Sequence, residues 1–473
     1  MAVTVRRAGW RLARAWPVVA ACALIGVLTG ANRPGATPPL FAAGVLANEQ
    51  TLAGIGTRDA EGAAWLDSSS VLRLADGRLR WLPPGATEPV DAAPDDPEAL
   101  AAATAERAWL ATGKLPGATP GQRLAATRAL LDLRLLIRPG GAAVAAPEPY
   151  WAYVWPRDAS FAAAALAVTG HRDEARAILG FLGTTQRADG TWPARSRPDT
   201  GEVGDGRAPQ LDATGWVPWA AWLASDGGTD LDAAERLWPV VRQAAAAAAR
   251  SLRPDGLPPA GPDYRERRER QPTLGTAAPL RAGLRSAARL AAILGHRDDE
   301  RVFRTAAVTL DAGMRRHLVG PRVQADRLTP VLEGAGGPGG WQRTPAGGGA
   351  DQAVTWLAPP FAPAEPGVRA AVAAARAELT VQGGGIVPGL PWAEADPWTP
   401  ATASFALAAA GLGDRAATDR LLGWLLDHRT ALGSFPERVR RADGAPRSAA
   451  PLGWTAALVV LTLSQAEAPL PIP

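Results

Sequence analysis

Cysteine, lysine and histidine are scarce in this chain. Cys22 is the only cysteine among 473 residues, which excludes a disulfide framework and leaves no nucleophilic cysteine elsewhere. Lys114 is the only lysine, so arginine carries nearly all of the positive charge. The four histidines share no metal-ligand spacing, and the glycine loops that bind phosphates or dinucleotides are missing as well. We therefore expect no metal and no cofactor.

The sequence also lacks a basic surface that would favour nucleic acid. The net charge is +4, but residues 1–48 hold five arginines and no acidic residue. The remainder of the chain is therefore close to neutral. Together with the lack of a nucleic-acid-binding motif, this excludes a polyanion-binding protein.

The N-terminus has the pattern of an export signal. Four arginines within residues 6–14 precede the uncharged run 15–32. This pattern predicts a signal or anchor over residues 1–32, contact with the membrane through that segment, and an extracytoplasmic location for the rest. An uncleaved anchor, a cleaved signal, a lipoprotein box ending at Cys22 and a simple buried helix all remain open.

The rest of the chain divides by pattern into three further parts. Residues 33–50 are a linker rich in proline, glycine and alanine, and residues 51–95 are a small β-rich appendage with a turn at Asp76-Gly77. Residues 96–468 are long Ala/Leu/Arg helices, so the fold class is mainly α. We expect helices near 97–112, 120–136, 158–169, 172–187, 211–225, 231–251, 276–294, 298–317, 366–380, 398–411, 414–430 and 447–466, and a shorter one at 351–358.

A weak internal repeat connects these helices. Similar loops follow helix pairs at residues 189–193, 255–258, 385–388 and 433–436. A hairpin of helices buries its apolar face only against neighbouring hairpins. The spacing therefore predicts a closed double ring of six hairpins with its long loops on one side. An open helical solenoid is the alternative.

The first long loop combines aromatic and charged residues. Trp151, Tyr153 and Trp155 stand directly before Arg157 and Asp158. Aromatic rings pack on the flat face of a sugar, while polar groups at the rim bind its hydroxyls. The loop therefore predicts a sugar platform, although Asp158 is equally suited to cap the following helix.

The other long loops add polar residues and carboxylates. The loop 189–212 contributes Trp192, Gln210 and Asp212, and the loop 261–270 is highly charged, a pattern also typical of a solvated surface. Trp216, Trp219 and Trp222 come next, at a helical spacing that favours core packing over ligand contact. Paired carboxylates in an aromatic-lined site are the groups that cleave glycosidic bonds.

Six stretches together resemble glycoside hydrolase family 15, the glucoamylases and their bacterial relatives. They occur in the family's order over about 320 residues: 155–158, 209–216, 263–266, 273–278, 389–392 and 436–454. The resemblance implies an (α/α)6 barrel and an inverting exo-acting α-glycosidase of the glucoamylase or glucodextranase type. Its substrate would be an α-glucan or α-glucoside.

The resemblance also assigns roles to residues. It implies that Glu266 is the general acid and Glu437 the general base, with Glu269 as an alternative to Glu266. Arg157 and Asp158 would hold the non-reducing sugar. Further substrate contacts are expected from Trp151, Tyr153, Trp155, Trp192, Gln210, Asp212, Asp263, Trp392 and Trp454.

Two departures from the family pattern bear on activity. Arg265 stands where the family has a tryptophan before the acid, and Arg438 follows the base where glutamine is common. An arginine beside a carboxyl favours its ionised form, which suits a base and harms an acid. Catalysis by Glu266 therefore requires Arg265 to point away, toward Asp263 or Glu269. A carbohydrate-binding or scaffold protein on the same barrel, and a lyase, are the alternatives.

Overall fold

The structure is a computed structural model in which the N-terminal segment is not described. Described are residues 62–84, 86, 89–201, 203, 205–267, 269–317, 350–390 and 396–473, and the backbone of 330–331 and 342–343. The predicted signal or anchor, the linker and the start of the β-rich appendage lie outside these residues. Within the described part, no helix is long and apolar enough to cross a membrane.

A small antiparallel sheet opens the described chain. Its strands follow one another in the order β1 (Ala64–Trp65), β2 (Leu72–Arg73), β3 (Leu79–Trp81) and β4 (Val90–Ala92). The turn between β2 and β3 has Gly77 at φ 88°, a backbone conformation that favours glycine. Its amide donates to the Leu74 carbonyl at 2.9 Å. The Asp76-Gly77 hairpin predicted from the sequence is therefore present.

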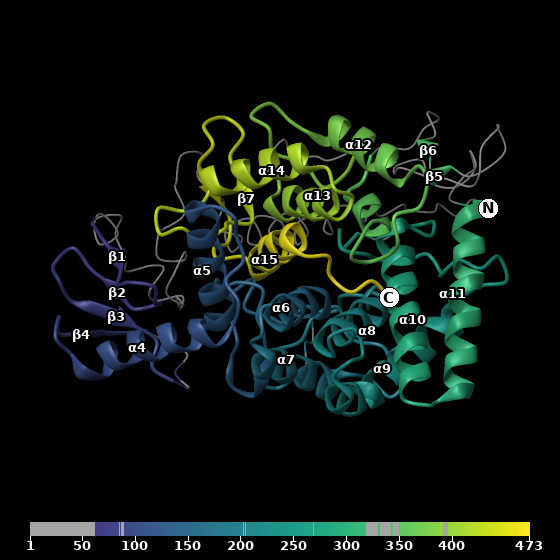
Figure 1. Ribbon diagram of the computed structural model, residues 1–473, viewed down its shortest axis with the longest axis horizontal. Coiled ribbons are helices and arrows are strands. Elements are labelled where there is room, and N and C mark those ends of the chain that lie inside the picture. The colour runs from purple at the N-terminus through teal and green to yellow at the C-terminus, as the bar shows by residue number, and fades with distance from the viewer. Residues whose placement is uncertain are drawn as a thin grey trace, which may run out of the picture. The chain divides into compact units, whose positions relative to one another are not determined.

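Helices make up most of the chain after this sheet, which confirms the mainly α class (Figure 1). Their bounds are α4 Pro97–Thr112, α5 Pro120–Leu135, α6 Pro156–Val168, α7 Arg172–Thr185, α8 Ala213–Ala224, α9 Leu231–Ser251, α10 Leu274–Ile293, α11 Arg297–His317, α12 Val368–Leu379, α13 Thr399–Gly411, α14 Arg415–Asp427 and α15 Gly453–Glu467. Two 3-10 helices, η2 (Pro139–Gly141) and η3 (Gln352–Leu357), and two short strand pairs, β5 (Pro330–Val331) with β6 (Gln342–Arg343) and β7 (Arg438–Val439) with β8 (Pro446–Arg447), complete the elements.

Two helices begin two residues earlier than predicted. Asp158 is the third residue of α6, which begins at Pro156 because proline is well suited to the first helical turn. Thr276 lies inside α10, whose N-cap is Thr273. Asp230 does cap α9, since its carboxylate accepts from the Ala233 amide at 3.0 Å.

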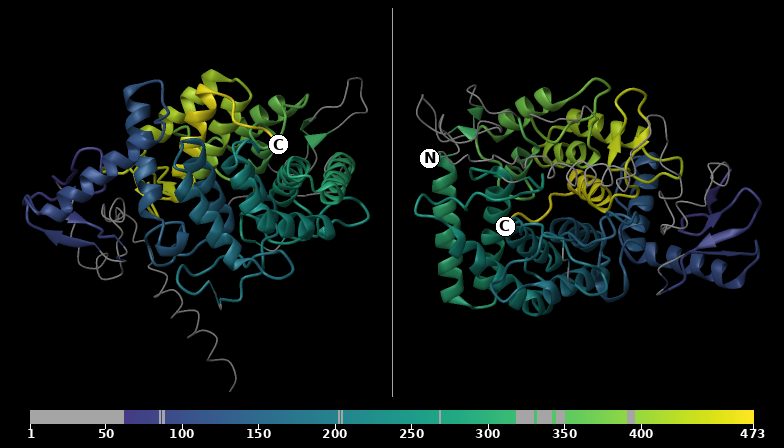
Figure 2. Two further views of the ribbon diagram at one scale, coloured as in Figure 1. Left: turned by 60° about the horizontal axis from the view of Figure 1, so that its bottom comes forward. Right: turned by 180° about the vertical axis from the view of Figure 1, so that it is seen from behind.

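The contacts between helices form a circuit. α6 packs on α8, α8 on α10, α10 on η3, η3 on α13, α13 on α15, and α15 back on α6. The helices α7, α9, α11 and α14 each pack against the helix that precedes them in sequence, as α10 and α11 show (Figures 1 and 2). Gly215 lets α8 approach α10 closely, because a Cβ there would lie 2.1 Å from the Pro279 carbonyl oxygen.

Aromatic side chains fill the space enclosed by this circuit. Phe161 of α6 contacts Trp216 and Trp219 of α8 with ring centroids 4.9 and 5.1 Å apart. Trp216, Trp219 and Trp222 are buried, which confirms the core-packing interpretation of their spacing. Large aromatic rings contribute most of the apolar area of such a core.

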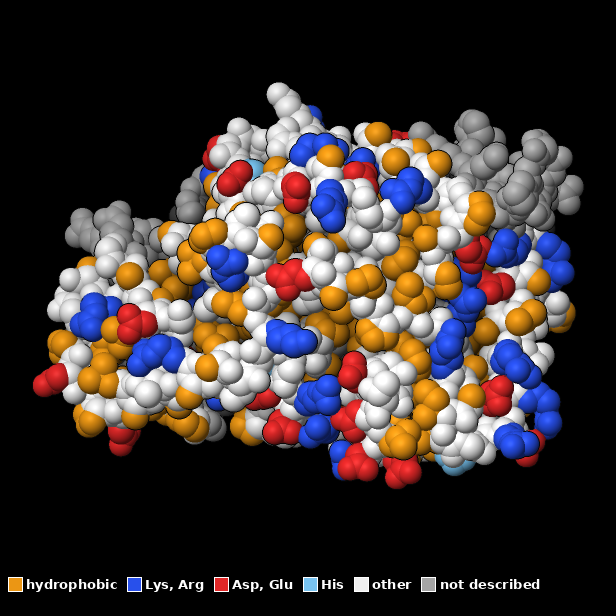
Figure 3. Space-filling view, viewed as in Figure 1, with side chains coloured by type: hydrophobic (Ala, Val, Ile, Leu, Met, Phe, Trp, Pro, Cys, Tyr) orange, Lys and Arg blue, Asp and Glu red, His pale blue; other side chains and the backbone are white. Residues whose placement is uncertain are grey.

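The surface is charged but mixed. On the face shown in Figure 3, arginines and acidic side chains are interspersed among the described residues. Such a mixture fits the near-neutral charge of the chain beyond residue 48.

Candidate active site

One cavity brings the two predicted catalytic carboxylates together. Glu266 and Glu437 both line it, and its volume is ≈ 220 Å³. That is below the roughly 300–1,000 Å³ of pockets for drug-sized ligands and suits a small ligand such as one sugar ring. The other lining residues are Ala145, Tyr150, Trp151, Trp155, Arg157, Asp158, Tyr264, Arg265, Trp398, Pro400, Arg438, Leu452 and Trp454.

The cavity lies at the N-terminal ends of several helices in the circuit. Arg157 is in the first turn of α6, Trp398 is the N-cap of α13, and Trp454 is in the first turn of α15. The loop that carries Glu266 ends where α10 begins. Helix N-termini present unpaired amides and a positive dipole end, so this side of the fold favours carboxylates and sugar oxygens.

Glu437 is the buried member of the pair. It accepts a hydrogen bond from the Ser448 hydroxyl, and Arg438 lies 3.6 Å from the same oxygen. Burial raises the pKa of Glu437 to about 7, opposed by hydrogen bonds from Ser448 and the Trp151 side chain and assisted by the charges of Asp158 and Glu266. A carboxyl with this pKa changes its protonation state near neutral pH, a property that suits general acid–base chemistry.

Glu266 has a different environment. Its backbone is left-handed, with φ 54°, and its side chain is about a quarter exposed. The Trp155 indole nitrogen donates to one carboxylate oxygen at 2.5 Å, and the Arg207 guanidinium pairs with the other. An ion pair with arginine is made by the ionised carboxylate, which is not the form that donates a proton.

Arg207 belongs to a network at the rim of the cavity. Its Nε donates to Asp205 at 3.0 Å and its Nη2 to the Tyr150 hydroxyl at 3.0 Å. Arg195 donates to the same Asp205 at 2.9 Å and lies 3.8 Å from the centre of the Tyr153 ring. The loop 195–207 is thus tied to both the aromatic platform and Glu266.

Arg157 and Asp158 form a buried pair in the cavity wall. Arg157 Nη2 lies 3.0 Å from Asp158, and its guanidinium lies 4.7 Å from the centre of the Trp454 ring. Burial opposes the charge of Arg157, but the surrounding carboxylates, above all Asp158 and then Asp212, raise its pKa. Arg157 therefore stays charged and presents a planar fork of hydrogen-bond donors in the cavity wall.

Gln210 and Asp212 both contact the guanidinium of Arg157. Arg157 Nη1 donates to Gln210 at 3.1 Å and lies 3.7 Å from Asp212. Burial raises the pKa of Asp212 to about 6. Neither residue lines the cavity. Both lie next to Arg157, outside the cavity wall.

The loop that carries the predicted acid is held by buried hydrogen bonds. Asp263 accepts from the Thr273 hydroxyl at 2.6 Å and from the Arg265 amide at 3.1 Å. Gly275 is required here, because a Cβ would lie 2.2 Å from the Asp263 carboxylate. Asp263 therefore shapes the loop and does not line the cavity.

Arg265 has an ion-pair partner that the sequence did not suggest. Its Nη1 lies 3.6 Å from Asp351, which also accepts from the Tyr264 hydroxyl at 2.8 Å. The sequence predicts Asp263 or Glu269 as the carboxylate for this arginine, and Asp351 is a further carboxylate beside it. The arginine that pairs with Glu266 is Arg207, from another loop.

The remaining predicted contacts fall into three places. Trp192 is fully buried in the core, where its indole donates to the Leu182 carbonyl at 2.7 Å, so it does not line the cavity. Tyr153 is half-buried beside Trp155 and Arg195, outside the lining residues. Trp392 lies outside the described residues, and Glu269 does not line the cavity.

Three residues near the carboxylates were missed from the sequence. Arg207 and Ser448 contact Glu266 and Glu437 directly, and Glu148 interacts electrostatically with Glu437. Glu148 directly precedes the aromatic loop, but a lone carboxyl in a Pro-rich stretch is a weak signal. Only the folded chain shows that it faces residue 450, which is 302 positions away in sequence.

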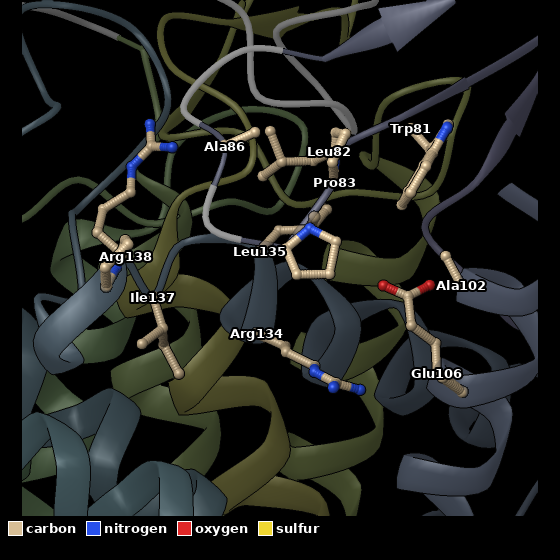
Figure 4. Close-up of a pocket in the computed structure, with 13 residues that line it drawn as sticks. Trp81, Leu82, Pro83, Ala86, Ala102, Glu106, Arg134, Leu135, Ile137 and Arg138 are labelled. Carbon is tan, nitrogen blue, oxygen red and sulfur yellow. The ribbon is translucent and has the colours of Figure 1, made fainter. Parts of the chain in front are cut away.

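A second cavity, of ≈ 450 Å³, lies between β3, α4 and the end of α5 (Figure 4). Most residues that line this second cavity are apolar, among them Trp81, Pro83 and Ile137. Glu106 is the only carboxylate among its lining residues, and it accepts from the Ser70 amide. Acid–base cleavage by two carboxyls is therefore favoured in the cavity of Glu266 and Glu437.

Comparison with known proteins points to one group of enzymes. The model of Glycosyl hydrolases family 15 matches residues 124–191. An uncharacterized glycosyl hydrolase of Methanocaldococcus jannaschii is 31% identical over 124 residues, which are 25% of this chain and 19% of that protein. The chain thus spans about a fifth of the length of this relative.

Solved structures show the same fold at low identity. A wild-type glycosidase has a TM-score of 0.59 and 18% identity, covering 73% of this chain and 97% of its own. A bacterial glucoamylase complexed with acarbose has a TM-score of 0.57 and 18% identity over 79% of this chain and 62% of its own. The glucoamylase of Saccharomycopsis fibuligera has a TM-score of 0.56 and 13% identity over 74% and 96%. Together with the family match, these likenesses confirm the resemblance and support a glycosyl hydrolase.

Proposed function

We propose that this chain, which resembles glycoside hydrolase family 15, is an inverting exo-acting α-glycosidase on an (α/α)6 barrel. The observation that carries the proposal is that Glu266 and Glu437 line one small aromatic cavity together with Arg157 and Asp158. The closed circuit of α6, α8, α10, η3, α13 and α15 supports the barrel. Structural neighbours bound to glucose and to acarbose support a carbohydrate substrate.

The proposed reaction divides the work between the two carboxyls. Glu266 donates a proton to the leaving glycosidic oxygen, and Glu437 removes a proton from the water that attacks the anomeric carbon from the other face. Arg157 and Asp158 bind hydroxyls of the terminal sugar, whose flat face packs on Trp151 or Trp155. A cavity of this size accommodates the end of a chain better than its middle, which favours exo action.

Arg207 sets a condition for this reaction. Because it pairs with ionised Glu266, a protonated acid requires that Arg207 turn away. Asp205, which Arg207 already contacts at 3.0 Å, is the carboxylate toward which it can turn. Substrate entry beside Trp155 would drive this exchange.

The same ion pair favours a second candidate function. If Arg207 stays on Glu266, the site binds a sugar and does not cleave it, and the chain is a carbohydrate-binding or scaffold protein on the same barrel. The aromatic wall and the Arg157–Asp158 pair serve either function.

Anomer-resolved NMR of the product distinguishes an inverting glycosidase from a carbohydrate-binding protein. Wild-type protein incubated with a panel of α-glucosides and α-glucans should release β-glucose, and Glu437→Gln should not. Binding of glucose or maltose without turnover of any glycoside would support the binding protein. Release of α-glucose would contradict the inverting mechanism.

We further propose that residues 1–32 direct export, which places the cavity outside the cytoplasm. The support is the arginine-rich start followed by the uncharged run 15–32. A phosphatase reporter fused after residue 50 should be active only in the periplasm or outside the cell. Equal activity of a fusion lacking residues 1–32 would contradict export.

A further inference from the structure

Three consecutive residues, 448–450, connect Glu437 to Glu148 through hydrogen bonds. The Ser448 hydroxyl donates to the Glu437 carboxylate. The Ala449 carbonyl accepts from the Glu437 amide at 2.7 Å. The Ala450 amide donates to the Glu148 carboxylate at 3.0 Å. The segment 448–450 is thus bonded to Glu437 at two points and to Glu148 at a third.

A second connection runs through the aromatic loop. The Trp151 amide donates to the Glu148 carbonyl at 2.8 Å, and the Trp151 side chain is hydrogen-bonded to Glu437. The Glu148 backbone carbonyl thus positions Trp151, whereas the Glu148 side chain reaches Glu437 through Ala450 and Ser448. Glu148 lies outside the lining of the cavity, so it is placed to act through them.

The backbone of this segment needs an anchor. Ser448 has φ 68°, a left-handed conformation that a serine adopts only where its surroundings hold it. The anchor is a long-range one, since Ala450 and Glu148 are 302 positions apart. Losing it would let Ser448 relax and turn its hydroxyl away from Glu437.

We propose that Glu148 is a positioning residue for the general base: its side chain anchors the segment 448–450 so that Ser448 holds the Glu437 carboxyl in place. This inference rests on the proposed function, because it takes Glu437 as the base. Glu148 itself touches neither the substrate nor the water.

The charge state of Glu148 suits this role. Burial raises its pKa to about 8, with the Ala450 hydrogen bond opposing and the Glu437 charge assisting. Its second oxygen is buried without a hydrogen-bond partner among the described residues. A neutral Glu148 keeps an acceptor for Ala450 and adds no negative charge beside Glu437. Glutamine offers the same acceptor, so it is the conservative replacement.

Paired variants test the anchor. Glu148→Ala removes the acceptor, and Glu148→Gln keeps it. Glu467 provides the matched control, because it also accepts from a backbone amide, that of Gly117 at 2.6 Å, but at the other end of α15 from Trp454. The measurements are kcat and KM on the best α-glucoside, the pH profile of kcat/KM, and amide exchange at Ala450 and Gly117.

The expected results differ sharply between these variants. Glu148→Ala should lower kcat about 30-fold with KM changed less than about threefold, since the base is misplaced while sugar contacts remain. Its Ala450 amide should exchange at least tenfold faster. Glu148→Gln should keep kcat within about threefold of the wild type, and Glu467→Ala should change only exchange at Gly117.

Two outcomes would overturn the anchor. One is a Glu148→Ala protein with wild-type kcat and pH profile, and the other is a Glu148→Gln protein as slow as Glu148→Ala. A wild type that cleaves no glycoside would instead contradict the proposed function. In that case amide exchange still decides whether Glu148 holds Ala450, because wild-type protection at Ala450 in the Glu148→Ala protein would refute it.

Discussion

The two sides of the cavity hold their carboxyls in opposite ways. Glu437 is buried, receives a serine hydroxyl, and has a pKa raised to about 7. Glu266 is partly exposed, has a left-handed backbone and pairs with Arg207. One environment admits a neutral carboxyl and the other stabilises a charged one. Residue identity alone does not assign proton donor and acceptor, because the surroundings decide which form of each carboxyl prevails.

The largest effect is expected from removing either carboxyl. Glu437→Gln and Glu266→Gln should each lower kcat by about 10²–10⁴, the usual contribution of a general acid or base. An aryl glucoside with a good leaving group tells them apart, because it needs no protonation. It should restore most of the rate of Glu266→Gln and none of Glu437→Gln. If the aryl glucoside instead restored the rate of Glu437→Gln, Glu437 would be the general acid and Glu266 the general base.

The next effect concerns the buried pair behind the Glu266 loop. Arg265→Trp restores the family's residue but breaks the ion pair with Asp351. This pair is buried, since the side chain of Arg265 is 4% exposed and that of Asp351 is 0% exposed. Removing one partner of a buried pair costs about 3–5 kcal/mol, so we expect a loss of stability in urea denaturation. Arg267→Trp, on the same loop but exposed, is the control. Unchanged stability of Arg265→Trp would show that the pair is not formed.

A smaller effect should come from releasing Glu266. Arg207→Met removes the guanidinium that pairs with Glu266, so kcat/KM measured across the pH range should rise about tenfold. Arg197→Met, an exposed position on the same loop, should leave the profile unchanged. An active wild type whose Arg207→Met variant loses activity would mean that Arg207 binds the substrate, as for an anionic sugar. The proposal of a neutral glucan would then fail.

The smallest effect concerns the base. Glu437 must be ionised to act, so kcat/KM should fall as the pH drops below about 7. The Ser448 hydrogen bond lowers this pKa, so Ser448→Ala should move the acid limb upward by about one pH unit, in addition to the loss of kcat expected when Ser448 no longer holds Glu437. Thr430→Ala, which alters a hydroxyl in the preceding loop, should not move it. An acid limb that stays in place would show that Ser448 does not bond the ionised form.

The helices were predictable because each has a local signal. The bounds of α4 and α9 match the predicted ranges, and most others differ by only a few residues. The start of α15 is an exception, since Arg447, where the helix was predicted to begin, lies in β8 and the helix begins at Gly453. Local pattern does not show where strand pairing takes priority over helix.

The site was only partly predictable for a related reason. Trp151, Trp155, Arg157 and Asp158 share one loop, and all line the cavity. Arg207 lies 59 positions from Glu266, and no local pattern connects them. The sequence therefore indicated the neighbour in the chain, Arg265, as the arginine that would affect the acid. Pairings between loops depend on tertiary contacts, which composition and spacing do not encode.

The closing contact of the circuit, α15 on α6, has a consequence for how the protein is made. Arg157 lies in the first turn of α6 and Trp454 in the first turn of α15, and their contact forms part of the cavity wall. A nascent chain emerging from the ribosome therefore has most of its helices before it has a binding site. Contacts of such long range form slowly, because the loop must close before they stabilise anything. Until α15 docks, part of the aromatic interior is exposed to solvent, and such exposed apolar surface favours aggregation or binding by chaperones.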